Sequence, residues 1–157
     1  MRIGLGYDVH SFREGDGIIL GGVSIPFNKS LKGHSDADVL LHAITDAILG
    51  ALALGDLGEH FPDTDPAYKG IDSKLLLAET YSMMIDRGYV LVNLDATVVA
   101  EKPKLNPHMH DIRHSISECL HCDIEQVSVK ATTSEKMGFI GREEGIAVHA
   151  IVLIQRV

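Results

Sequence analysis

The chain has 157 residues, is 45% hydrophobic without any tryptophan, and carries a formal net charge of -8 with histidine neutral. This length suits one domain, residues 1–157, with a mostly aliphatic core. The acidic balance argues against a basic nucleic-acid-binding surface. No apolar run reaches the roughly 18 residues that a membrane helix needs, and the N-terminus starts with a strand pattern instead of a signal-peptide core. We therefore expect no nucleic-acid or membrane partner and a cytoplasmic location, or an organelle protein shown without its transit peptide.

A first strand is predicted at residues 2–7, with Asp8 and His10 at its end. Side chains alternate faces along a strand, so Asp8 and His10 point the same way, about 7 Å apart along the backbone. A carboxylate and an imidazole placed in this way can bind one divalent metal. The alternative is a polar strand end that faces solvent, so a metal site requires further ligands elsewhere in the chain.

A β-hairpin is predicted next. Residues 18–20 and 23–25 flank Gly21-Gly22, a strong signal for a two-residue turn. Residues 26–33 carry no clear pattern and are expected to form a loop.

The first long helix is predicted from Ser35 to about Leu54. Ser35 and Asp38 resemble a capping box, and Gly55 can end the helix in the left-handed conformation. The helix is apolar almost throughout, which predicts that most of it is buried.

His42 is a polar exception in this apolar helix. A buried histidine is commonly a hydrogen-bonded core residue, but Asp8 and His10 offer it partners. One carboxylate and two imidazoles are typical of zinc with an open fourth position. His34 and Ser35 lie at the predicted helix N-terminus, where an anion is favoured.

An acidic loop with two prolines follows at residues 56–66. Loops of this length usually carry function or are disordered. Phe61 and the prolines favour an ordered loop, and a solvated connector is the alternative.

A second helix is predicted at residues 74–87, capped by Asp72-Ser73 and ended by Gly88. A long strand follows at residues 89–99. Residues 101–107 form a second candidate ligand loop, and Asn106-Pro107 suits the start of a third helix that runs to about Leu120.

This third helix carries His108, His110 and His114, and Cys119 and Cys122 lie at its end. A metal pair of histidines is conceivable, but no carboxylate or cysteine clearly shares their face, and incidental metal binding is the favoured interpretation. A second cysteine pair is lacking, so the thiols are interpreted as structural or incidental.

A short strand at residues 127–131 leads to Thr132, Thr133 and Ser134, which precede Glu135. The hydroxyls suit a phosphate oxygen, and Glu135 suits a hard cation. The alternative is an N-cap for one helical turn. The last strand, residues 146–154, is apolar on both faces, so both faces are expected to be covered.

A series of motifs extends along essentially the whole chain: Asp8-x-His10, His34-Ser35-Asp36-x-Asp38 with His42, Gly55-Asp56-x-Gly58, Phe61-Pro62-Asp63-Thr64-Asp65, Pro103-Lys104, Lys130-Ala131-Thr132-Thr133-x-Glu135-Lys136-x-Gly138-Phe139 and Gly141-Arg142. Together they resemble one family, 2-C-methyl-D-erythritol 2,4-cyclodiphosphate synthase of the non-mevalonate isoprenoid pathway. The departures are small: Leu5 stands where some members carry histidine, and Ser134 where many carry threonine.

The resemblance implies a phosphorus–oxygen lyase that converts 4-diphosphocytidyl-2-C-methyl-D-erythritol 2-phosphate to the 2,4-cyclodiphosphate and releases CMP. It implies zinc on Asp8, His10 and His42, and magnesium or manganese on Glu135. His34 and Thr133 would stabilise the transition state. The implied substrate-binding residues are Asp8, His10, His34, Ser35, Asp56, Leu57, Gly58, Phe61, Pro62, Asp63, Thr64, Asp65, Ala100, Glu101, Lys102, Pro103, Lys104, Leu105, Asn106, Ala131, Thr132, Thr133, Ser134, Glu135, Phe139 and Arg142; of these, residues 100–106 with 131–133 would form the cytidine pocket.

For the fold we predict the α+β class, with a four-stranded mixed sheet, helices on one face and the hairpin as an appendage. The resemblance implies a homotrimer whose sheets pack together and whose sites lie between subunits. Two alternatives stay open: a metal-dependent hydrolase of diphosphate substrates, and a non-catalytic trimeric ligand-binding protein.

Overall fold

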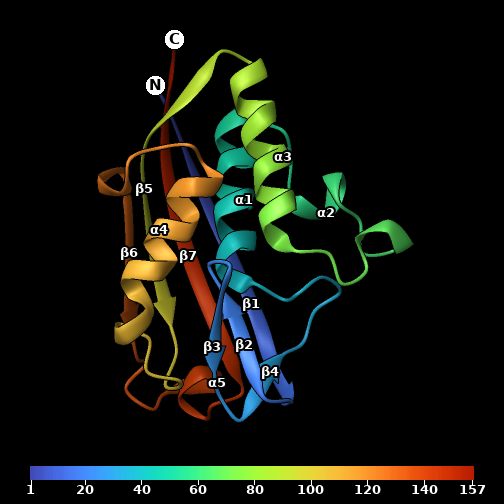
Figure 1. The fold of residues 1–157 in the computed structure, drawn as a ribbon, viewed down its shortest axis with the longest axis vertical. Helices are drawn as coiled ribbons and strands as arrows, with labels where there is room; N and C mark the ends of the chain where they lie inside the picture. The colour runs from blue at the N-terminus through green and yellow to red at the C-terminus, as the bar shows by residue number, and fades with distance from the viewer.

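One mixed sheet carries the main helices on a single face (Figure 1). In this computed structural model, which describes residues 1–157, the sheet has five strands. In spatial order they are β4 (Lys29–Leu31), β1 (Arg2–Glu14), β7 (Gly145–Arg156), β5 (Tyr89–Val99) and β6 (Val127–Thr132). Neighbouring strands are antiparallel except β5 and β6, which are parallel. The predicted α+β class and mixed sheet are confirmed, but the predicted strand count of four is wrong.

The extra strand, β4, lies in the stretch expected to be a loop. It has only three residues, including Lys29 and Ser30, so it lacks the alternating apolar pattern that marks a half-buried strand. β4 pairs with residues 12–14 at the end of β1, which extends to Glu14 and not to Tyr7 as predicted. Asp8 and His10 therefore lie within a continuous strand and not at its end. The backbone of β1 stays paired with β7 at both positions.

The helices and the remaining segments follow in chain order. They are β2 (Gly17–Leu20), β3 (Val23–Pro26), α1 (Val39–Leu52), α2 (Leu57–His60), η1 (Pro66–Tyr68), α3 (Ser73–Asp86), η2 (Asn106–His108), α4 (Met109–Cys119), η3 (Ile124–Gln126) and α5 (Gly138–Gly141). The predicted hairpin is confirmed as β2 and β3, and both turn glycines have positive φ, as a two-residue turn requires. The third helix begins as the short turn η2 before α4.

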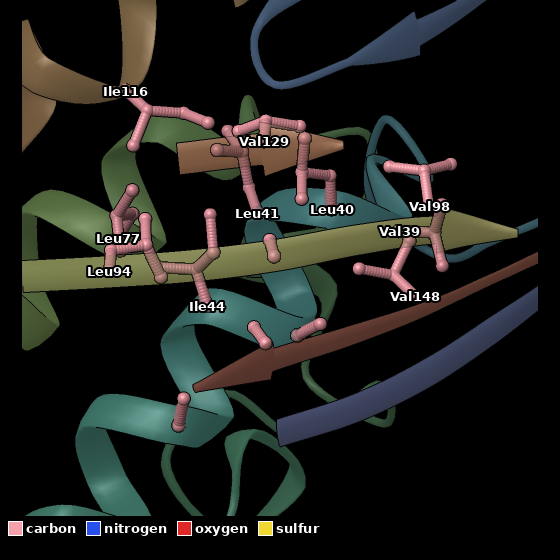
Figure 2. Packing of buried hydrophobic residues seen from close by; sticks show 14 of the residues in the cluster. Val39, Leu40, Leu41, Ile44, Leu77, Leu94, Val98, Ile116, Val129 and Val148 are labelled. Atoms are coloured by element: carbon pink, nitrogen blue, oxygen red, sulfur yellow. The ribbon is translucent and has the colours of Figure 1, made fainter. Parts of the chain in front are cut away.

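The buried helix α1 lies at the centre of the core. Twelve of its fourteen residues are buried, and Figure 2 shows Leu40, Leu41 and Ile44 among side chains from α3, α4 and the sheet. The expected caps are wrong. Asp38, not Ser35, is the N-cap, because its carboxylate accepts from the backbone N–H of Leu41. Ala53, not Gly55, is the left-handed C-cap.

Strand β1 approaches α1 so closely that only glycine fits on its inner side. A Cβ on Gly4 would lie 1.8 Å from the carbonyl oxygen of Ala47, and one on Gly6 would lie 1.9 Å from that of Ala43. The alternation that turns these glycines toward the helix also turns Asp8 and His10 toward it. This contact therefore sets the distance between β1 and α1 at the candidate site.

The opposite face of the sheet is open in the single chain. On β1, Ile3 and Leu5 are 69% and 66% exposed, and Ile151 on β7 is 44% exposed. Within one chain only the helix-facing side of the last strand is covered, so the expectation that both faces are covered stays a prediction about the assembled protein. The outer face of β5 carries the polar residues Asn93 and Asp95, so the exposed apolar surface lies on β1 and β7. None of the helices combines the length and the apolar character needed to cross a membrane.

Candidate active site

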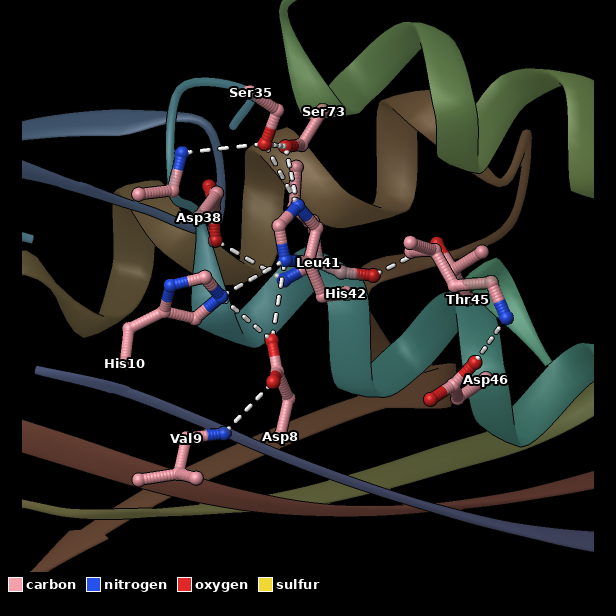
Figure 3. Close-up of polar contacts among 12 residues, drawn as sticks. Asp8, Val9, His10, Ser35, Asp38, Leu41, His42, Thr45, Asp46 and Ser73 are labelled. Atoms are coloured by element: carbon pink, nitrogen blue, oxygen red, sulfur yellow. Dashed lines mark hydrogen bonds and ion pairs between the residues drawn. The ribbon is translucent and has the colours of Figure 1, made fainter. Parts of the chain in front are cut away.

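Three potential metal ligands converge between β1 and the first turn of α1 (Figure 3). The nearest oxygen of Asp8, Oδ2, lies 3.0 Å from His10 Nε2 and 3.1 Å from His42 Nδ1. The two imidazole nitrogens are 3.2 Å apart. All three side chains are largely shielded, with exposures of 26%, 15% and 11% respectively. The structure thus brings together the three ligands that the sequence predicted.

The second ring nitrogen of each imidazole, which faces away from the cluster, also has polar partners. His10 Nδ1 lies at hydrogen-bond distance from the carbonyl oxygen of Lys32, so it donates and leaves Nε2 free to bind a metal. His42 Nε2 lies 3.0 Å from Ser35 Oγ and 2.9 Å from Ser73 Oγ. Such outer partners orient the histidine ligands of metal sites.

The carboxylate of Asp8 and the imidazole of His10 shift each other's pKa values. Burial alone would raise the pKa of Asp8, but the adjacent His10 and His42 side chains outweigh this and hold the pKa well below its usual range. Burial alone would lower the pKa of His10, yet the Asp8 carboxylate and the Lys32 carbonyl favour its protonated form and raise the pKa overall. Asp8 is therefore a carboxylate at neutral pH.

The donor set fits a divalent metal. One carboxylate oxygen and two imidazole nitrogens within 4.8 Å of one another are the donors that zinc and related ions accept. Around a tetrahedral metal such as zinc they would supply three of the four ligands, with the fourth position open. It is the only group of three or more potential ligands in the chain, so His108, His110 and His114 form no such site. Cys119 and Cys122 are free thiols.

A cavity of about 510 Å³ opens over this cluster. Its lining includes many of the residues that the resemblance implied: Asp8, His10, His34, Ser35, His42, Asp56, Leu57, Gly58, Phe61 and Asp63. Phe61 is buried, whereas Pro62, Thr64 and Asp65 of the same loop do not line the cavity.

Sequence reasoning did not assign five further lining residues, Gly33, Asp46, Tyr68, Ile71 and Leu76. Asp46 carried a usable signal, because it is polar and lies one turn after His42 on an apolar helix. Burial raises the pKa of Asp46, and its Oδ1 accepts from Leu57 N at 2.7 Å. The others are a glycine, a tyrosine and two aliphatic residues, and none of them stands out in the sequence as a metal ligand or a charged group.

A second cavity, of about 530 Å³, lies at the other edge of the sheet. Its lining is Ala100, Glu101, Pro103, Lys104, Leu105, Asn106, Pro107, Ala131, Thr132 and Thr133, close to the set expected for the cytidine pocket, though without Lys102. The Glu101 carboxylate joins the two contributing loops, because it accepts from Ser134 N at 3.0 Å and Lys136 N at 3.1 Å.

The two cavities are separate within one chain. Strands β7 and β5 lie between β1 and β6, so the two edges are roughly 14 Å apart at the usual strand spacing. Glu135 is exposed and takes a hydrogen bond from Thr133 Oγ1 at 3.3 Å, but it lines neither cavity. Phe139 and Arg142 do not line either cavity. Arg142 Nε instead donates to Glu144 Oε1, at 2.6 Å.

Comparison with known proteins adds an independent observation. The profile of the YgbB family matches residues 1–155. The 2-C-methyl-D-erythritol 2,4-cyclodiphosphate synthase of Chloroherpeton thalassium is 57% identical over 157 residues, which is the whole of both chains. That of Ectopseudomonas mendocina is 59% identical over 154 residues, or 98% of each chain.

Solved structures agree with the fold. The chain resembles IspF of Plasmodium falciparum in complex with CDP, at 36% identity and a TM-score of 0.87, with 99% of this chain and 96% of that one covered. It resembles the bifunctional IspDF of Campylobacter jejuni at 45% identity and a TM-score of 0.96, with 99% of this chain and 42% of that one covered.

Proposed function

This chain belongs to the YgbB family and shares the synthase function of its curated relatives in isoprenoid biosynthesis, and we propose the following account of its reaction. The substrate is 4-diphosphocytidyl-2-C-methyl-D-erythritol 2-phosphate. An oxygen of its 2-phosphate attacks the β-phosphorus of its own diphosphate, the bond between that phosphorus and the oxygen bridging to the α-phosphate breaks, and CMP leaves. The products are CMP and the 2,4-cyclodiphosphate, which makes the enzyme a phosphorus–oxygen lyase.

The observation that carries this proposal is the convergence of Asp8, His10 and His42 in the wall of a cavity that the loop at 56–63 also lines. Intramolecular phosphoryl transfer depends mainly on positioning and on neutralising charge. A divalent metal, for which we propose zinc, would act there as a Lewis acid toward a phosphate oxygen. The chain itself then needs no nucleophile.

The other residues position the substrate in this proposal. His34 lines the cavity beside the metal ligands, and we assign it to the reacting phosphates together with Thr133. Asp56, Gly58 and residues 61–65 would contact the erythritol and the ribose. Residues 100–106 and 131–133 would bind cytidine, since all of them except Lys102 line a cavity of their own. Magnesium or manganese would bind Glu135 and the substrate phosphates, because such ions use few carboxylates and keep several waters.

The separation of the two cavities supports sites that are shared between subunits. Residues assigned to one small substrate lie at opposite edges of the sheet, so the second half of each site would come from a neighbouring chain. The exposed apolar side chains on the outer face of β1 and β7 would be buried by such a neighbour. We therefore propose a homotrimer of one-domain subunits, and we propose the cytoplasm as its compartment.

Product analysis with the proposed substrate tests the function. Phosphorus NMR distinguishes a cyclic diphosphate from the linear product of a hydrolase, and CMP is measured in the same sample. We expect the cyclic product and CMP in equal amounts. A linear product would support the hydrolase alternative, and the absence of CMP would support a non-catalytic binding protein.

A further inference from the structure

A chain of hydrogen bonds runs from His42 away from the metal position to a carboxylate. His42 Nε2 lies 2.9 Å from Ser73 Oγ (Figure 3), and Ser73 Oγ donates to Asp36 Oδ1. The backbone N–H of Ser73 also donates to Asp36 Oδ2, at 3.0 Å. Both oxygens of Asp36 are therefore engaged by the same serine, which fixes the position of its hydroxyl.

The chemistry of these groups determines the direction of each bond. An ionised carboxylate only accepts, so the single hydroxyl proton of Ser73 goes to Asp36. Ser73 Oγ must then accept from His42, which places the N–H on Nε2. A neutral imidazole has one N–H, so Nδ1, which faces Asp8 and His10, keeps a free lone pair.

Ser73 is well placed for this role, and its neighbour Ser35 is not. Ser73 is the first residue of α3 and is 0% exposed. Ser35 Oγ lies 3.0 Å from the same nitrogen, but no carboxylate accepts its proton, so its bond to His42 can run in either direction. The loop before α1 and the start of α3 are further joined by a bond from Asp36 N to Ile71 O, at 3.0 Å.

We propose that Ser73, oriented by Asp36, is a positioning residue that holds His42 in the tautomer whose Nδ1 binds the metal. The proposal rests on the proposed function only in requiring a divalent metal at Asp8, His10 and His42. Without the Ser73 hydroxyl, His42 can accept from Ser35 through Nε2, and the N–H then occupies the metal-facing nitrogen. The metal must displace that arrangement before it binds.

The test measures zinc affinity by competition with a chromogenic chelator in the full-length protein. Ser73→Ala is expected to bind zinc about 10- to 100-fold more weakly than wild type, the usual effect of losing an outer-shell partner. Asp36→Asn is expected to weaken zinc binding as well, because an amide has only one oxygen and cannot accept from both the backbone N–H and the hydroxyl of Ser73. Its NH₂ group must then face one of these two groups of Ser73. Thr80→Val is the matched control, since Thr80 is a 0% exposed hydroxyl residue on the same helix whose Oγ1 has no partner.

Two further readouts separate positioning from general loss of structure. With cobalt bound, the visible absorption of Ser73→Ala should differ from that of wild type, whereas Thr80→Val should match it. At saturating zinc, Ser73→Ala should recover most of its CMP release, because no group that touches the substrate has been removed.

Wild-type zinc affinity in both Ser73→Ala and Asp36→Asn would overturn the proposal. If Ser73→Ala does not fold, the test rests on Asp36→Asn alone. Zinc binding that is about tenfold weaker in this variant supports the proposal, and unchanged zinc binding refutes it. A wild-type affinity no better than that of His42→Ala would overturn the metal site itself, and this inference with it.

Discussion

His42 is the ligand that joins the buried helix to the strand, and its removal is the clearest change at the level of one residue. His42→Ala leaves two ligands, which cannot define a tetrahedral site. We expect a folded protein with little bound zinc and little synthase activity. Elemental analysis of the purified variant checks the zinc content.

The matched control is His114→Ala, on α4, where the imidazole is 59% exposed and pairs with Glu118. It removes a helical histidine without touching the site, so zinc content and activity should stay at the wild-type level. Wild-type zinc in His42→Ala would show that the three side chains do not form the metal site.

Glu135→Gln separates the second metal from the first. The substitution keeps the shape and removes the charge, so magnesium or manganese should bind more weakly. We expect activity that is partly restored at high magnesium or manganese, with zinc content unchanged. Titration of activity against each metal provides the measurement, and Glu125→Gln, an exposed change elsewhere on the surface, is the control. Activity that responds neither to the substitution nor to added metal would remove Glu135 from this role.

For single residues, the sequence was most informative where the periodicity of a strand or a helix was clear. Alternation in a strand placed Asp8 and His10 on one side, and a polar residue in an apolar helix singled out His42. The backing contacts of these ligands could not be predicted, because Ser73 and the Lys32 carbonyl reach them only through the tertiary fold.

Among the elements, the contact of β1 with α1 is the one on which the site depends. Gly6→Ala would place a methyl group 1.9 Å from the Ala43 carbonyl oxygen, so strand and helix must separate. We expect a loss of about 3 kcal/mol in the free energy of unfolding, typical of overpacking in a core, together with weaker zinc binding. Denaturant unfolding monitored by circular dichroism measures the first effect.

Gly50→Ala, within α1, is the control for that experiment. Its Cβ would meet only the Leu5 carbonyl oxygen, at 3.8 Å, and alanine is favoured over glycine in a helix by about 0.5–1 kcal/mol. Gly50→Ala should therefore stabilise the protein. A Gly6→Ala variant as stable as wild type would contradict the packing described here.

Elements with a strong local signal were predictable, and those held by tertiary contacts were not. The Gly21-Gly22 hairpin and the strand at 89–99 follow from turn chemistry and from β-branched residues, and both are confirmed. β4 is stabilised by tertiary contacts, its pairing with β1 and the burial of Leu31 in the core, so its three residues gave no local pattern. Asp38 outcompetes Ser35 as the helix cap because its carboxylate also accepts from the hairpin backbone, at Gly21 N and Gly22 N.

The whole molecule is proposed to be a subunit of a trimer, and the exposed outer face of β1 offers a direct test. Leu5→Asp places a charge on a side chain that is 66% exposed in one chain. It should leave the subunit folded and break the assembly, as measured by light scattering. Leu75→Asp, at a 60% exposed leucine on α3, should leave the assembly intact. A trimeric Leu5→Asp protein would place the interface elsewhere.

Mixing two inactive variants tests whether the sites are shared. One variant lacks His42 and the other lacks Thr133, so each carries one intact half of every site. Mixed trimers should regain part of the activity, because some interfaces combine both intact halves. No recovery in verified mixed trimers would refute shared sites and leave the metal assignment in place.

The isotopic composition of the product tests the central claim, intramolecular cyclisation, most directly. The reaction is run in water labelled with heavy oxygen, and the masses of CMP and of the diphosphate product are recorded. Attack by the substrate's own 2-phosphate incorporates no solvent oxygen, so we predict unlabelled CMP and an unlabelled product. One labelled oxygen per turnover in either product would show that water is the nucleophile, and would contradict the cyclisation.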